Sequence, residues 1–265
     1  MNNSIKNRID LLLSKSVAEG RPVLSPFITI GYPDKQKSID MGISILNSGG
    51  DMLELGVPFS DPLADGPTIQ KTSFVAIQNG INLSNCLNAA TAIRDSNSTA
   101  PLILMGYLNP FLHYGFEQFA SDASKSGIDG VIIPDVPAEE ARPYLEICDS
   151  NNIHFIPLLA PTSTDSRIEQ SCKNARGFVY CVSVTGTTGA RSNISKNLEL
   201  LVSKIRKYTE LPILVGFGVS TKKHFQDVTR FADGAIIASA MLDAVASDLT
   251  TDAAITASNF IKGIK

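Results

Sequence analysis

The sequence has few cysteines, few histidines and no excess of basic residues, and each shortage argues against a class of protein. Among 265 residues there are four cysteines and three histidines, and the formal net charge is −3. The cysteines form no C-x-x-C pair and have no neighbouring histidine ligands, so we expect reduced packing residues of a cytoplasmic protein rather than a zinc site or a disulfide framework. Because nucleic acids and anionic membranes attract clustered Lys and Arg, we expect neither as a partner.

Long apolar runs are also missing, although 43% of the residues are hydrophobic. No run is long enough to cross a bilayer. The first residues carry apolar side chains at helical spacing instead of an unbroken apolar segment with a cleavage site, so we expect no signal peptide. A chain of this length and apolar content can bury a large core, and we predict a single domain over residues 1–265.

What the sequence does contain is a regular rhythm of short runs rich in Val, Ile, Leu and Phe. Eight such runs lie at residues 24–31, 52–57, 102–107, 130–135, 154–160, 178–183, 212–218 and 234–239. Amphipathic stretches between or after them, at 38–47, 138–150, 197–208 and 252–265, are typical of helices. Eight strand and helix units in about 250 residues predict an α/β fold of the (β/α)8 TIM-barrel class. An additional helix near residues 3–18 is expected to cap the bottom of the barrel.

A doubly wound open sheet is the main alternative to the barrel. That fold normally carries a G-x-G-x-x-G turn after its first strand, where this chain has Ile30-Gly31-Tyr32-Pro33-Asp34. Dinucleotide binding therefore loses support.

The residue that most clearly indicates chemistry is Glu54, a carboxyl group inside an apolar strand-like run. Burial should raise its pKa into the range where it can both donate and accept a proton. A structural ion pair is the alternative interpretation. Between Arg21 and Lys71 the only basic residues are Lys35 and Lys37, so the local sequence offers no obvious counter-ion.

Functional groups of a (β/α)8 barrel lie at the C-terminal ends of the strands and in the loops that follow. Asp61 and Asp65 lie on the loop after the second strand. Tyr107 and Asp135 end the third and fourth strands, and Tyr180 lies in the sixth. Glycine-rich turns after strands six and seven, with a short helix beginning near Ala240, favour a phosphate cradle of backbone N–H groups.

Two kinds of barrel-enzyme chemistry find no support in the residues. A Schiff-base aldolase needs a lysine inside the barrel, and none of the eight strand runs contains one. A metal-dependent aldolase needs a cluster of histidines and carboxylates, whereas His113, His154 and His224 are dispersed, so we expect no metal site.

Six motifs in order resemble those of the tryptophan synthase α subunit family, along essentially the whole chain. They are PFITIGYP at 26–33, LELGVPFSDPLADGP at 53–67, MGYLNP at 105–110, PDVP at 134–137, VTGTTGAR at 184–191 and GFGVS at 216–220. The resemblance implies cleavage of indole-3-glycerol phosphate to indole and glyceraldehyde 3-phosphate, without a cofactor in this subunit.

By this resemblance Glu54 is the general acid and base, and Asp65 holds the indole N–H and stabilises the positive charge on the ring. The resemblance also implies the following substrate-binding residues: Phe27, Tyr107, Asp135, Tyr180, Thr188, Gly189, Gly216, Phe217, Gly218, Ala238 and Ser239. Ala238 departs from the family pattern, which usually has Gly there. Its methyl group is expected to narrow the phosphate pocket or to exclude a positive φ, with a small effect on affinity.

The implied partner is the pyridoxal-phosphate β subunit, in an α2β2 heterotetramer that receives indole directly. Two alternatives stay open. A stand-alone indole-releasing lyase would share Glu54 and Asp65 but work without a partner. A non-catalytic regulatory barrel would only bind a phosphorylated ligand, and the intact buried Glu54, which costs stability, argues against it.

Overall fold

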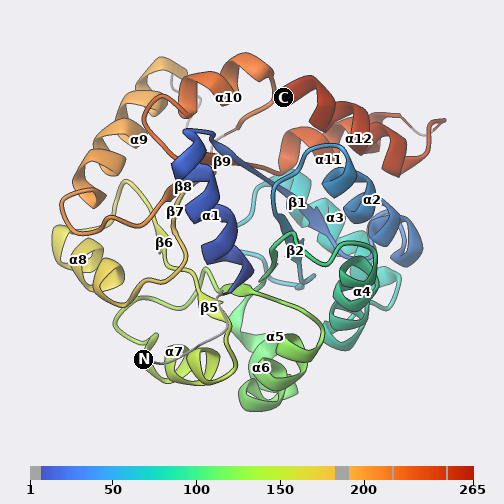
Figure 1. The fold of residues 1–265 in the computed structure, drawn as a ribbon. Coiled ribbons are helices and arrows are strands. Elements are labelled where there is room, and N and C mark those ends of the chain that lie inside the picture. The colour runs from blue at the N-terminus through green and yellow to red at the C-terminus, as the bar shows by residue number, and fades with distance from the viewer. Residues whose placement is uncertain (1–6, 183–190, 217, 249) are drawn as a thin grey trace.

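The computed structural model describes residues 7–182, 191–216, 218–248 and 250–265, and in them short parallel strands alternate with helices. The strands are β1 (Val23–Thr29), β2 (Leu53–Gly56), β3 (Leu102–Met105), β4 (Gly130–Ile132), β5 (His154–Phe155), β6 (Leu158–Leu159), β7 (Val179–Val182), β8 (Ile213–Gly216) and β9 (Gly234–Ile237). They form one sheet in the order β5-β4-β3-β2-β1-β9-β8-β7-β6. In Figure 1 this sheet is curled into a ring, and the helices lie outside it.

The fifth predicted strand, at 154–160, is divided into β5 and β6 by Pro157. Proline has no backbone N–H, so it interrupts the strand ladder. The backbone still connects both neighbours: the Ile156 N–H donates to the Val131 carbonyl at 2.9 Å, and the Pro157 carbonyl accepts from the Tyr180 N–H at 3.0 Å. Because β5 pairs with β4 and β6 pairs with β7, the divided strand closes the sheet. The predicted (β/α)8 fold is confirmed, and its fifth strand consists of two short segments, β5 and β6.

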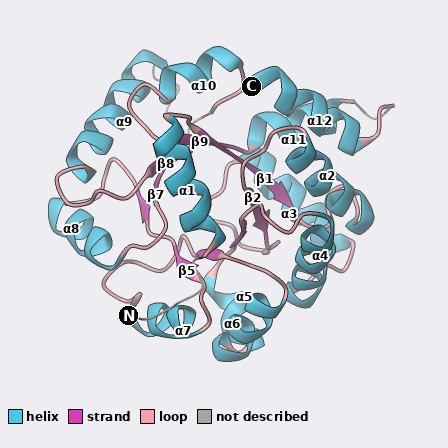
Figure 2. Ribbon diagram, in the orientation of Figure 1, coloured by secondary structure: helices cyan, strands magenta, loops and turns pink. Residues whose placement is uncertain are grey.

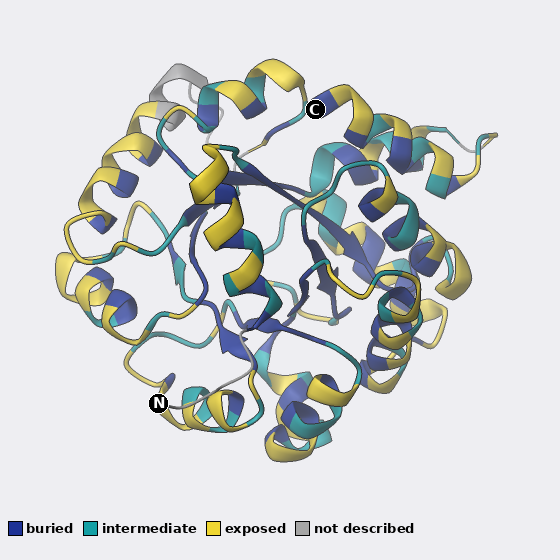
Figure 3. Cartoon of the chain, in the orientation of Figure 1, coloured by how far each residue is buried: buried dark blue, intermediate teal, exposed yellow. Residues whose placement is uncertain are grey.

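The helices surround the strands as an outer layer (Figure 2). They are α1 (Arg8–Glu19), α2 (Lys35–Asn47), α3 (Pro67–Gln78), α4 (Leu83–Ser96), α5 (Leu108–Tyr114), α6 (Phe116–Lys125), α7 (Arg142–Ser150), α8 (Asp165–Asn174), α9 (Arg191–Ile205), α10 (Lys222–Val228), α11 (Ser239–Ser247) and α12 (Ala253–Ile264). Their buried residues face the strands and their exposed residues face solvent, as Figure 3 shows. This is the pattern expected of amphipathic helices.

The helix predicted at residues 138–150 begins later than expected. Residues 138–150 were predicted to be helical, but α7 begins at Arg142 and Pro143 lies in its first turn. Had the helix begun at residue 138, Pro143 would have been in its interior, where its ring would clash and an N–H would be missing. A turn closed by Glu140 N–H and the Pro137 carbonyl, 3.0 Å apart, precedes the helix instead.

The N-terminal helix α1 closes the bottom of the barrel, as predicted, but it begins at Arg8 rather than near residue 3, because Asn7 is extended and caps it. Ile9 and Leu13 are buried in the same interior cluster as Met52 and Phe178. A side chain at Gly130 would come within 2.9 Å of Ile9, so the glycine makes room for the helix. In Figure 1 α1 crosses the centre of the ring of strands.

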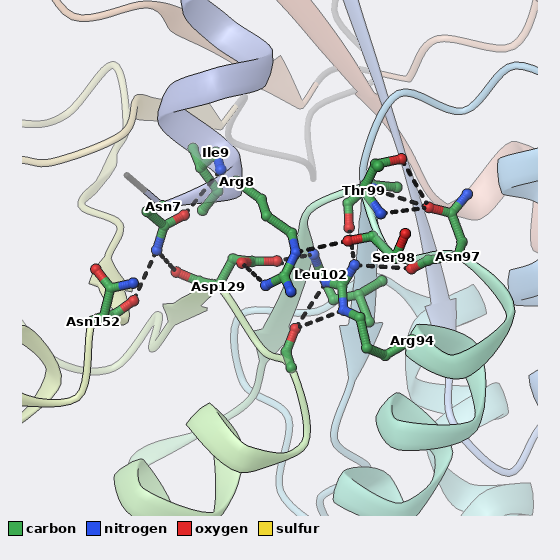
Figure 4. Close-up of polar contacts among 12 residues, drawn as sticks. Asn7, Arg8, Ile9, Arg94, Asn97, Ser98, Thr99, Leu102, Asp129 and Asn152 are labelled. Carbon is green, nitrogen blue, oxygen red and sulfur yellow. Dashed lines mark hydrogen bonds and ion pairs between the residues drawn. The ribbon is translucent and has the colours of Figure 1, made fainter. Parts of the chain in front are cut away.

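A buried carboxylate, Asp129, fastens α1 to the N-terminal ends of the strands (Figure 4). Arg8 of α1 donates to one of its oxygens at 2.9 Å, and Arg94 of α4 donates to the other at 2.8 Å. The Leu102 N–H also donates to that second oxygen, at 2.9 Å. The Asn7 side chain, directly before α1, donates to the backbone carbonyl of Asp129. This end of the barrel is thus held by polar contacts over an apolar plug.

Candidate active site

Glu54 lies in the middle of β2 with its side chain inside the barrel, and it is completely buried. Ser25 of β1 donates to Glu54 Oε1 at 2.8 Å, whereas Glu54 Oε2 has no hydrogen-bond partner in the described part of the chain. Burial raises the pKa of Glu54 to about 8, and the Ser25 hydroxyl offsets part of this rise. The predicted direction of the pKa shift is confirmed. Since the described contacts of Glu54 include Ser25 but no cation, the structure does not favour the ion-pair interpretation.

Asp65 lies on the loop between β2 and α3, above Glu54 in the barrel mouth. The side chain of Tyr107 holds this loop, because its hydroxyl accepts the Ala64 N–H at 2.9 Å. Burial raises the pKa of Asp65 to about 6, and hydrogen bonding by Tyr107 lowers it in part. The two carboxyl groups therefore have pKa values on opposite sides of neutrality.

Three predicted aromatic residues lie around these carboxyl groups, and all three are buried. Phe27 is opposite Glu54 in the register of β1 and β2. Tyr107 contacts the Asp65 loop, and its ring lies 5.3 Å from that of Phe59. Burial raises the pKa of Tyr180 well above its usual value, and the charges of Glu54 and Asp65 act in the same direction, so its hydroxyl stays protonated.

Two glycines provide the space that these rings occupy. A side chain at Gly56 would come within 2.4 Å of the Phe27 ring, and one at Gly216 within 2.6 Å of the Tyr180 hydroxyl. Gly216 was predicted as part of a phosphate cradle. The structure shows that it also allows Tyr180 to reach into the barrel.

A cavity of about 1290 Å³, counting the part open to solvent, occupies the C-terminal end of the barrel. It is lined by Leu63, Ala64, Asp65, Gly66, Ile69, Met105, Pro134, Leu158, Tyr180, Val182, Gly216, Gly218, Val219, Ile236, Ala238, Ser239 and Ala240. A smaller adjoining cavity, which shares Asp65 and Met105 with it, is lined by Phe27 and Tyr107. Glu54 itself lines neither cavity. A cavity at the C-terminal end of a barrel, with apolar walls and a few polar groups, is the expected place for a small-molecule ligand.

The far side of the cavity contains the N-terminus of α11. Ala238 precedes this helix and Ser239 begins it, and the described contacts include no side chain that caps it. The free N–H groups of a helix N-terminus favour an anion. Ala238 has φ −128°, so its methyl group excludes no conformation that the backbone needs here. The prediction that Ala238 excludes a required positive φ is therefore wrong. The prediction that its methyl group narrows the phosphate pocket remains a prediction.

Asp135 takes a different place from the other predicted residues. It is exposed and lines neither cavity, and both of its carboxylate oxygens accept the Leu108 N–H, at 2.9 and 3.2 Å. Since Leu108 begins α5 directly after Tyr107, Asp135 holds the backbone beside that ring. Thr188, Gly189 and Phe217, which were also predicted to bind substrate, lie outside the described residues.

Sequence reasoning missed Ser25. Its position two residues before Phe27 places it on the same face of β1, and Phe27 is the register partner of Glu54. A polar residue within an apolar strand was the available signal, but its partner could be identified only once the register was known.

Comparison with known proteins gives consistent matches over the whole barrel. Residues 13–262 match the family model for the tryptophan synthase alpha chain. The alpha chain of Roseiflexus sp. (strain RS-1) is 40% identical over 248 residues, which cover 94% of this chain and 95% of that protein. The alpha chain of Chloroflexus aggregans (strain MD-66 / DSM 9485) is 42% identical over 237 residues, which cover 89% of each. A crystal structure of tryptophan synthase subunit alpha from Legionella pneumophila strain Paris aligns with a TM-score of 0.91 at 33% identity, covering 98% of this chain and 97% of that one.

Proposed function

Because the chain belongs to the tryptophan synthase alpha chain family, it is a lyase that cleaves indole-3-glycerol phosphate, and we propose that Glu54 and Asp65 perform the cleavage. The supporting observation is the contrast between the two carboxyl groups. With pKa values of about 8 and about 6, Glu54 is mainly protonated at neutral pH and Asp65 mainly ionised. Such a pair supplies one acid and one anion at the same pH.

In the proposed reaction the Glu54 carboxyl group donates its proton to C3 of the indole ring. Asp65 accepts a hydrogen bond from the indole N–H and stabilises the positive charge that then develops on the ring. The Glu54 carboxylate takes the proton of the side-chain hydroxyl next to the ring, and the carbon–carbon bond breaks. The bonding electrons return to the ring, so that indole and glyceraldehyde 3-phosphate leave and Glu54 is protonated again.

We propose one orientation of the substrate in the cavity. The ring is proposed to lie among Phe27, Tyr107 and Tyr180, next to Asp65, and the phosphate at the N-terminus of α11. Ala238 and Ser239 at this helix end, together with Gly216 and Gly218, would hold the phosphate oxygens. The family resemblance adds Thr188, Gly189 and Phe217 to this proposal.

The partner is proposed to be the β subunit, in an α2β2 assembly. A groove beside the barrel mouth, lined among others by Pro58, Asn109 and His113, offers a surface next to the loop that carries Asp65. One of the matching solved structures, at 30% identity and a TM-score of 0.87, is a crystal structure of tryptophan synthase from M. tuberculosis. In this proposal pyridoxal phosphate belongs to the β subunit, this chain needs no cofactor for its proton transfers, and the assembly works in the cytoplasm.

Indole release from indole-3-glycerol phosphate tests the proposal. We expect Glu54→Gln to lose about 10²–10⁴-fold in kcat, the usual contribution of a general acid and base, and Asp65→Asn about 10²-fold or more. Adding a β subunit should increase the activity of the unaltered chain. Full activity in Glu54→Gln would contradict the assignment of the acid, and activity indifferent to the β subunit would contradict the partner.

A further inference from the structure

We propose that Ser25 is a positioning residue for the cleavage: its hydroxyl holds one oxygen of Glu54, so that the other oxygen carries the proton that is transferred. The inference rests on the proposed role of Glu54. It concerns a hydroxyl group that does not line the substrate cavity.

The register of the barrel places the two side chains together. Phe27 of β1 is paired with Glu54 of β2, and Ser25 lies two residues earlier on the same inward face. Ser25 Oγ and Glu54 Oε1 are 2.8 Å apart, a normal length for this hydrogen bond. Both residues are 0% exposed, so water does not compete for either group.

The hydrogen bond makes the two carboxyl oxygens different. Oε1 accepts the Ser25 proton, whereas Oε2 is buried without a described partner. A protonated carboxyl group carries its proton on one oxygen and accepts through the other. With Oε1 occupied, the proton belongs on Oε2, which is left free to donate it to the substrate.

Serine has little packing value in this part of the barrel. The inward residues around it belong to an apolar interior cluster that includes Val23, Ile103, Leu214 and Ile236. A hydroxyl group buried among them costs free energy unless it is hydrogen-bonded, and Glu54 is the described side-chain partner that it has. The residue therefore suits a role toward Glu54 better than a role in filling space.

The hydrogen bond also affects the protonation of Glu54. Burial raises the pKa of the carboxyl group and Ser25 lowers it. The other titratable groups near this centre are Tyr180 of β7 and Asp65 above it, and Tyr180 stays neutral because its own pKa is raised. Removing the Ser25 hydroxyl should therefore raise the pKa of Glu54 further.

The pH dependence of kcat/KM tests the inference in Ser25→Ala. Since the reaction starts from protonated Glu54, activity falls as the pH rises through its pKa, and we expect this alkaline limb to move upward by about one pH unit. We also expect kcat to fall roughly tenfold or more, with little change in KM, because the acid is less well oriented. Ser25→Thr keeps the hydroxyl and should restore the pH profile.

Ser258→Ala is the matched control, because it removes a buried serine hydroxyl that bonds Ser48 on the outer helical layer, at 2.7 Å. It should leave the pH profile and kcat unchanged. If Ser25→Ala fails to fold, Ser25→Cys has a similar volume and only a weak donor, and should shift the limb in the same direction.

Infrared titration of the Glu54 carboxyl band, with Glu54→Gln as the reference, measures the contact without substrate. An upward shift of this titration in Ser25→Ala supports the inference, and an unchanged titration and unchanged alkaline limb would overturn it. If Glu54→Gln remained fully active, the proposed function would fail, while the infrared titration would still report whether Ser25 holds Glu54.

Discussion

Glu54 shows how a single residue can exchange stability for reactivity. Its carboxyl group is buried with one neutral donor, Ser25, beside it. An ionised carboxylate in this place would have no cation beside it in the described part of the chain. Burial therefore favours the neutral acid and raises the pKa of Glu54 well above its usual value. The same rise in pKa that keeps a proton on Glu54 at neutral pH must lower the stability of the fold at higher pH.

We expect Glu54→Gln to stabilise the protein, and to do so more at pH 9 than at pH 5. The pKa of Glu54 is about 8 in the folded state against a usual value of 4.5, so between these values the unfolded chain binds fewer protons and stability falls as the pH rises. The amide removes this loss, which amounts to roughly 4–5 kcal/mol above pH 8. Urea unfolding at the two pH values measures it.

Glu140→Gln is the control, because Glu140 is exposed. It should change stability by less than about 0.5 kcal/mol at either pH. An equal effect of Glu54→Gln at pH 5 and pH 9 would show that the folded-state pKa of Glu54 is not raised.

At the scale of elements, the number of strands and their parallel alignment could be predicted from the sequence, while side-chain contacts between strands could not. Apolar runs gave all eight barrel strands, and their alternation with helices indicated a parallel closed sheet. The division of the fifth strand at Pro157 was missed, and so was the start of α7 beside Pro143. In both places proline changed the local hydrogen bonding without changing the apolar pattern on which the prediction rested.

The site was predicted unevenly for the same reason. Glu54 could be proposed because a carboxyl group in an apolar run is a local feature, and Asp65 because its loop motif resembles that of the family. Ser25 acts on Glu54 across two strands, and Asp135 acts through the backbone of Leu108, so their contacts depend on register and on loop geometry. Neither contact has a signature within its own stretch of sequence.

We expect Gly216→Ala to lower kcat/KM by about tenfold. Its methyl group would lie 2.6 Å from the Tyr180 hydroxyl, so the ring of β7 would have to move at the centre of the site. Steady-state kinetics measures the loss, and Tyr180→Phe in the same chain should recover part of it by removing the crowded oxygen.

Gly263→Ala is the matched control, since the added methyl group in helix α12 would have no described neighbour within 4 Å beyond the nearby backbone of the helix and the adjoining residues. It should leave kcat/KM unchanged and stabilise the helix by about 0.5–1 kcal/mol. Equal losses in the two variants would mean that the crowding at Tyr180 has no specific effect.

At the scale of the whole molecule, the barrel separates its chemistry from its stability. Asp65 and the cavity lie at the C-terminal end of the strands, next to Glu54 in the middle of β2, and α1 with the Asp129 contacts closes the opposite end. Barrels of this class generally have their active sites at the C-terminal ends of the strands and contacts that stabilise the fold at the N-terminal ends. Described helices include none that is long and apolar enough to cross a membrane. The prediction that residues 1–265 form a single domain remains a prediction.

Arg94→Ala should therefore destabilise the protein by about 3–5 kcal/mol. Under conditions in which the variant is folded, its kcat/KM should stay within about twofold of that of the unaltered chain. The Asp129 side chain is only 4% exposed, so losing Arg94, itself 11% exposed, leaves a buried charge without its main partner. Arg8 contacts the other oxygen but is 38% exposed, and Arg8→Ala should cost about 1 kcal/mol or less. Urea unfolding and indole-release kinetics on the same samples give both quantities. A parallel loss of stability and kcat/KM in Arg94→Ala would show that the two ends of the barrel are coupled. The expected result is a loss of stability with unchanged activity, whereas Glu54→Gln should gain stability and lose activity. Together these outcomes would show that the two ends act independently.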